Sequence, residues 1–75
     1  MSEKLPRVTA KDIIRVIEKQ GFYLSRQSGS HMIYKNINDK RVTIPFHRSV
    51  ILHPKIIKTI LKDIEMTTDQ LRQLL

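Results

Sequence analysis

With 75 residues and no cysteine, the chain is long enough for one small domain, residues 1–75, whose core has no support from disulfides or cysteine-bound zinc. Its 14 lysine and arginine residues against 7 acidic ones give a net charge of +7, which favours a nucleic acid or an acidic protein as partner over a solvated basic surface without a partner. No apolar run approaches the length of a membrane span or resembles a signal peptide, so a cytosolic protein is expected.

The first predicted element is a helix from about residue 10 to Gln20, after an N-terminal arm of residues 1–8. Thr9 is a suitable N-cap, and Asp12 completes a short capping box. Gly21 is placed to end the helix in a left-handed conformation. Cationic residues recur every four positions and predict a basic ridge along this helix, made of Lys11, Arg15 and Lys19.

Three short strands are predicted next, over residues 22–27, 30–36 and 41–44. Ser28 and Gly29 are typical of a two-residue hairpin turn, and residues 36–40 are rich in turn-forming side chains. Pro45 ends the third strand because it has no N–H to donate to a sheet.

Two helical segments follow a loop of residues 46–53. Pro54 suits the first turn of a helix, and the apolar residues after it recur at helical spacing. A second basic ridge lies on the polar side of this helix and consists of Lys55, Lys58 and Lys62. Thr67 and Gln70 form a capping box that opens a short helix in the C-terminal extension, residues 67–75. The order predicts an α+β fold of α-β-β-β-α type: a three-stranded antiparallel sheet with two helices on one face, plus a short C-terminal helix.

The turn lengths predict how the strands pair. A two-residue turn at Ser28 and Gly29 sets Arg26 opposite His31, and a four-residue second loop sets Ile33 opposite Ile44. Arg26 and His31 then lie at the rim of an apolar face that consists of Phe22, Leu24, Ile33, Val42 and Ile44. The other face would carry Tyr23, Ser25, Met32, Tyr34 and Thr43, and would offer an alternative docking surface for a protein partner or for a second copy in a homodimer.

His31 is the main candidate for chemistry. In RNA backbone cleavage the ribose 2′-hydroxyl is the nucleophile, so the protein needs only a group that transfers protons near neutral pH and cations that stabilise charge on the phosphate. His31 with Arg26 and nearby lysines provides both. A structural or merely exposed histidine is the alternative.

Other candidate sites are weaker. The three histidines, at positions 31, 47 and 53, come from a strand and a loop without an acidic partner, which disfavours a metal site. Ser30 and His31 are adjacent in a predicted strand and point to opposite faces, so they do not form a catalytic pair. Gly29 lies in a turn without the context of a phosphate-binding loop. No metal and no cofactor are expected.

Several segments stand out as a set: Leu5-Pro6-Arg7-Val8-Thr9, Gly21-Phe22, Gly29-Ser30-His31, Arg41-Val42-Thr43-Ile44-Pro45 and Ile60-Leu61-Lys62. Together they resemble the HicA (YcfA-like) family, the mRNA interferase toxins of toxin–antitoxin modules, over roughly residues 5–66. The chain departs from the family at residues 53–57, where relatives often have Gly-Thr-Leu, and in its extension of residues 67–75.

The resemblance implies a double-stranded-RNA-binding-domain-like fold and a metal-independent endoribonuclease that cuts mRNA. It places activity at the histidine of Gly-Ser-His, here His31, and implies a HicB-like antitoxin as partner. Under this interpretation His47 is a candidate second proton-transfer group, and the candidate RNA contacts are Arg26, Lys35, Lys11, Arg15, Lys19, Lys55, Lys58 and Lys62. The alternative is a non-catalytic RNA-binding module, or a degenerate toxin that acts through a protein partner.

Overall fold

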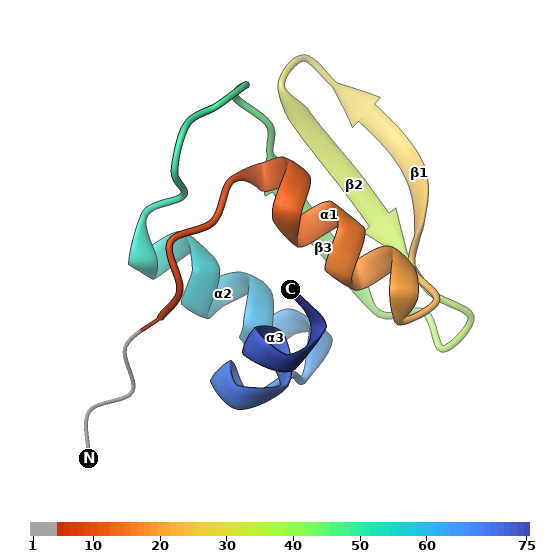
Figure 1. The fold of residues 1–75 in the computed structure, drawn as a ribbon. Coiled ribbons are helices and arrows are strands. Elements are labelled where there is room, and N and C mark those ends of the chain that lie inside the picture. The colour runs from red at the N-terminus through yellow and green to blue at the C-terminus, as the bar shows by residue number, and fades with distance from the viewer. Residues whose placement is uncertain (1–4) are drawn as a thin grey trace.

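The computed structural model describes residues 5–75, so residues 1–4 of the predicted arm lie outside the described part. Three strands form one antiparallel sheet of order β1-β2-β3. The elements follow one another (Figure 1) as α1 Ala10–Lys19, β1 Tyr23–Ser28, β2 His31–Lys35, β3 Arg41–Pro45, α2 Pro54–Ile64 and α3 Thr68–Leu74. This arrangement confirms the predicted α+β fold, which is like that of a double-stranded-RNA-binding domain.

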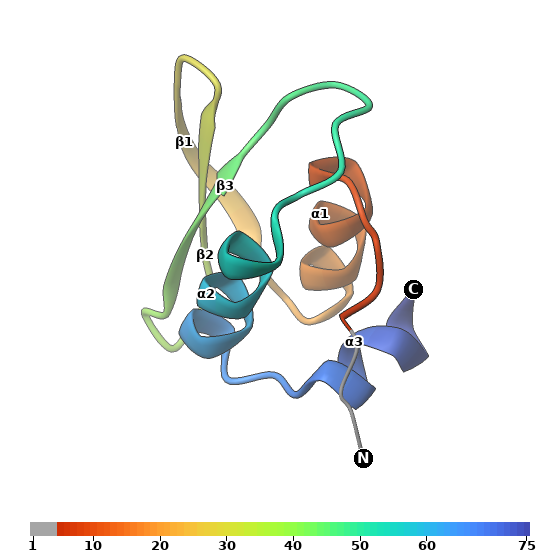
Figure 2. The same ribbon diagram turned by 90° about the vertical axis from the view of Figure 1, so that its left-hand side faces the viewer.

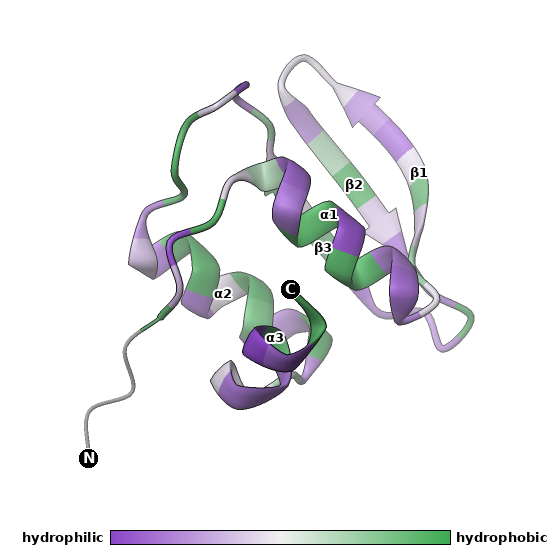
Figure 3. Cartoon of the chain, viewed as in Figure 1, coloured by the Kyte–Doolittle hydropathy of each residue, from purple (hydrophilic) through white to green (hydrophobic). Residues whose placement is uncertain are grey.

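The core lies between the sheet and the two longer helices. Figures 1 and 2 show α1 and α2 on the same side of the sheet, and Figure 3 shows apolar and polar residues alternating along both helices, as expected for helices with one buried face. The core side chains with at most 2% exposure include Ile13 and Ile17 of α1, Ile57 and Ile60 of α2, and Tyr34, Val42 and Ile44 of the sheet. Each buried isoleucine contributes about 1.5–3 kcal/mol of transfer free energy.

Local hydrogen bonds account for the ends of the helices. The Thr9 side chain accepts from the Asp12 N–H, and the Asp12 side chain accepts from the Thr9 N–H, so the predicted capping box of α1 is confirmed. Gly21 follows α1 with φ +89°, a left-handed conformation that glycine adopts without strain. The capping box of Thr67 and Gln70 at α3 is confirmed as well.

The predicted register of the first hairpin is wrong. Ser28 pairs with His31, so Gly29 and Ser30 are the two turn residues, rather than Ser28 and Gly29. Gly29 has φ +58° and Ser30 is not among the residues of positive φ, which fits a turn with glycine at its first central position. Arg26 is therefore opposite Ile33, and a bulge between Leu24 and Arg26 shifts the pairing again.

The second hairpin is also out of its predicted register, by one residue. Ile33 pairs with Thr43 and Tyr34 pairs with Val42. The connection is one residue shorter than expected, because the Asn36 N–H donates to the Lys40 carbonyl at 3.2 Å and Asp39 takes a left-handed φ of +64° to close the loop.

The one-residue slip inverts the whole of β2, since neighbouring strand residues point to opposite faces. Tyr34, 2% exposed, and the half-buried Met32 face the helices, whereas Ile33 lies on the face that the helices leave uncovered. Tyr23 pairs with Lys35 on that uncovered face, so the predicted docking face that combined Tyr23 with Met32 and Tyr34 does not exist. His31 lies not at the rim of the core but on the uncovered face, which we call the open face.

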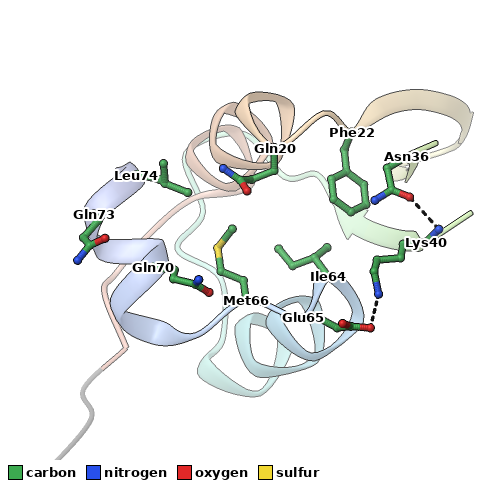
Figure 4. Close-up of a pocket in the computed structure, with 10 residues that line it drawn as sticks. All are labelled: Gln20, Phe22, Asn36, Lys40, Ile64, Glu65, Met66, Gln70, Gln73 and Leu74. Carbon is green, nitrogen blue, oxygen red and sulfur yellow. Dashed lines mark hydrogen bonds and ion pairs between the residues drawn. The ribbon is translucent and has the colours of Figure 1, made fainter. Parts of the chain in front are cut away.

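The C-terminal helix α3 packs on the helical layer. Leu71 is fully buried, and the Lys19 ammonium donates to the Leu74 carbonyl at 3.2 Å. A hollow of about 370 Å³ remains between α3, the end of α1 and the β2–β3 loop. Figure 4 shows the side chains that line it, among them Lys40, which forms an ion pair with Glu65. Within residues 5–75 no helix has the length and apolar character that crossing a membrane requires.

Candidate functional site

His31 occupies an accessible position at the start of β2, on the open face. Its neighbours across the sheet are Ser28 of β1 and Pro45 of β3. The side chain is exposed, and within residues 5–75 it has no hydrogen bond or ion pair. Both ring nitrogens are therefore available to a ligand, and histidine is the residue type that transfers protons near neutral pH.

Three cations share the open face with His31, and we call them the open-face cluster: Arg26, Lys35 and Arg41. Arg26 pairs with Ile33, and Lys35 pairs with Arg41, so all three side chains lie on the face that carries His31. Together with Ser25 and Ile33 they line a small hollow of about 140 Å³. Ile33 is 8% exposed although no helix covers it, because the stems of these long side chains lie around it.

The open face has a positive field without local compensation. The three strands contain no aspartate or glutamate, and in the described part of the chain no member of the open-face cluster has an ion-pair partner. Cations without a protein partner attract phosphate, which a guanidinium binds through two parallel hydrogen bonds. An RNA backbone that lies along this face would therefore contact the three cations and, at the start of β2, the imidazole of His31.

The two predicted basic ridges lie elsewhere. Their residues are exposed on α1 and α2, so the core separates them from His31. Lys19 is in addition engaged with the Leu74 carbonyl. Of the candidate RNA contacts, the structure brings only Arg26 and Lys35 onto the face of His31.

The remaining histidines are also apart from His31. His47 lines a groove on the helix side of the sheet, together with Met32 and Tyr34. His53 is the N-cap of α2, where its Nδ1 accepts from the Lys55 N–H at 3.0 Å. Among residues 5–75 there is no group of three histidine, cysteine or acidic side chains that could hold a metal ion.

Tyr34 is the one described residue with a clearly shifted proton affinity. Burial, and secondarily the negative charge of Glu18, raise the pKa of its phenol above the usual value of 10.0. The phenol therefore stays protonated at neutral pH and cannot act as a base. It lies on the opposite side of β2 from His31.

Sequence reasoning missed Arg41 as a site residue, and it also missed Phe46 and Arg48 in the groove that contains His47. The signal for Arg41 was its spacing from Lys35: the two form a cross-strand pair when Asn36 lies opposite Lys40 and three residues form the loop between those two. No comparable signal marked Phe46 and Arg48, because they lie in or next to a loop.

Comparison with known proteins identifies the family of the chain. No curated protein matches the chain. Residues 10–66, from the start of α1 to just beyond α2, match the family described as the HicA toxin of bacterial toxin–antitoxin systems. The match covers α1, the sheet with His31 and the open-face cluster, and α2, and it leaves out α3. The chain therefore belongs to the HicA toxin family.

Proposed function

We propose that this toxin is a metal-independent endoribonuclease that cleaves mRNA on its open face. The observation that carries the proposal is the environment of His31. Its imidazole is exposed and, within residues 5–75, has no partner, and the strands place three cations and no carboxylate on the same face. Family membership supports the same conclusion, since HicA toxins cut mRNA.

The proposed chemistry uses the 2′-hydroxyl of the substrate. His31 removes the 2′ proton as the 2′-oxygen forms a bond to the adjacent phosphorus, and the bond from phosphorus to the 5′-oxygen breaks. The leaving 5′-oxygen takes a proton from water, which reaches the site because His31 is exposed. Arg26 stabilises the negative charge that develops on the phosphate, and Lys35 and Arg41 bind phosphates further along the strand.

His47 has no step in this scheme, because it lies on the helix side of the sheet. The two ridges on α1 and α2 add to the positive field that draws RNA toward the protein.

We further propose that a HicB-like antitoxin inhibits the toxin by covering the open face. Membership in a toxin–antitoxin family implies an antitoxin partner. An acidic surface on that partner would neutralise the open-face cluster and would exclude RNA from His31.

The test is cleavage of a defined single-stranded RNA, with EDTA present, by the wild type and by folded His31→Ala. We expect the wild type to cut, and His31→Ala to bind the RNA without cutting it. A DNA oligonucleotide of the same sequence should bind but stay intact, because it lacks the 2′-hydroxyl. His53→Asn is the matched control and should keep its activity, because asparagine is also a good N-cap for α2 and this residue lies in neither the open face nor the groove with His47.

Cutting that survives in His31→Ala would remove His31 from the mechanism. Binding of RNA without cutting by the wild type would favour the non-catalytic RNA-binding module.

A further inference from the structure

A groove of about 720 Å³ opens on the helix side of the sheet. It lies between the start of α1, strand β2 and the loop that follows β3. Its floor consists of Ile14, Met32, Tyr34 and Phe46. We propose that this groove, the base groove, binds the base of an unpaired nucleotide of the RNA. The proposal rests on the function proposed above and adds a substrate preference to it.

The floor is suited to the face of a nucleobase. Phe46 and Met32 are only partly buried, so an aromatic ring and a polarisable sulfur are accessible to a ligand. Proteins that bind single-stranded nucleic acids stack bases on aromatic side chains, with a stabilisation of about 1–3 kcal/mol per base. Thioether sulfur also makes favourable contacts with aromatic rings.

The rim is suited to the phosphates that flank the base. Lys11, His47 and Arg48 border the groove, and none of the residues that line it is acidic. Across residues 5–75, Lys11 and Arg48 form no ion pair. An apolar floor and a rim whose charged residues are all basic are complementary to a nucleotide rather than to a neutral or cationic ligand.

The base groove and the proposed cleavage site lie at the same end of the sheet. The Phe46 N–H donates to the Ser30 carbonyl at 2.6 Å, and His31 lies opposite Pro45, so the groove and the imidazole flank the same end of β2 and β3. They are on opposite faces, since Met32 in the groove follows His31 in the strand.

An RNA strand that reaches both sites must therefore bend around this end of the sheet. A rigid A-form duplex cannot do so, because its bases stay paired and stacked. The geometry thus selects unpaired RNA, with the base in the groove belonging to a neighbour of the nucleotide at His31.

The three methionines of the chain offer a direct test, since Met32 lines the base groove and Met66 lines the hollow beside α3. We would label the methionine and isoleucine methyl groups of the uncleaving His31→Ala protein and add a short single-stranded oligoribonucleotide. The Met32 resonance should shift saturably, whereas the Met66 resonance should stay in place. A duplex of the same sequence should leave Met32 unchanged.

Two variants add a readout of affinity. Phe46→Leu, which keeps an apolar side chain, should weaken binding of the single strand by several-fold and alter the preference among the four homopolymers. Arg48→Gln should weaken binding by a similar factor. Arg72→Gln on α3 makes the same change in charge outside the groove and should leave affinity unchanged.

The outcomes separate this inference from the proposed function. If RNA shifts the Ile33 methyl resonance on the open face but not that of Met32, the base groove is not occupied and only the inference fails. If neither resonance responds to RNA and the wild type does not cut, the proposed function fails as well.

Discussion

Which surface carries the RNA backbone can be decided from the salt dependence of binding. The open-face triple variant, Arg26→Gln with Lys35→Gln and Arg41→Gln, removes every cation of the open-face cluster. The α2 triple variant, Lys55→Gln with Lys58→Gln and Lys62→Gln, removes the ridge on the opposite side of the core. Each lowers the net charge by three, from +7 to +4, so the two variants differ in the place of the charge and not in its amount.

The expected magnitude follows from counterion release. For single strands, log K falls with log salt concentration by about 0.7 for each phosphate that the protein neutralises. If each of the three cations of the open-face cluster contacts one phosphate, their loss lowers the slope by about 2. The α2 triple variant should change the slope by much less. Its lysines attract RNA from a distance without contacting phosphates, so they release few of the counterions that are bound to the RNA.

The assay is fluorescence anisotropy of a labelled single-stranded RNA, titrated with His31→Ala protein over about 50–200 mM salt. Circular dichroism and thermal melting of both triple variants establish that they fold. Glutamine keeps part of the stem that covers Ile33, and its helix propensity is close to that of lysine, so both variants should be stable. The opposite result, a slope reduced by about 2 in the α2 triple variant and unchanged in the open-face triple variant, would refute the assignment of the RNA to the open face.

Two further predictions concern stability. Leu71→Ala should lower the free energy of unfolding by about 2–5 kcal/mol in urea denaturation, because Leu71 is fully buried and its truncation leaves a cavity under α3. Leu75→Ala, at a half-exposed position, should lower it far less, and equal losses of stability in the two variants would contradict the packing of α3. Burial and Glu18 raise the pKa of Tyr34, so its contribution to stability should be complete below pH 10.0, the usual pKa, and should disappear as pH rises through the higher folded value. Urea denaturation against pH for the wild type and Tyr34→Phe measures this, and an identical alkaline decline in the two proteins would show that Tyr34 is not its cause.

Local sequence determined the elements of this protein, because their signals act over a few residues. Thr9 with Asp12, and Thr67 with Gln70, satisfy the free N–H groups at the starts of α1 and α3 by hydrogen bonds that span three residues. Gly21 ends α1 through a conformation that depends on its own backbone. The net charge and the motif around His31 likewise needed no tertiary structure to indicate a nucleic acid and a candidate catalytic residue.

Only the tertiary structure decided which face each strand residue occupies. Tyr34 and Ile33 are adjacent and both have large side chains that can be buried, so either could have entered the core, and the alternation pattern of β2 does not discriminate between them. The choice depended on where Gly29 lies in its turn and on how Asn36 and Lys40 close the second loop. One residue of register moved His31 to the open face and put Arg41 beside Lys35, because the side-chain period of a strand is two. The base groove could not be predicted from the sequence at all, since its walls come from a helix, a strand and a loop that meet only in the folded chain.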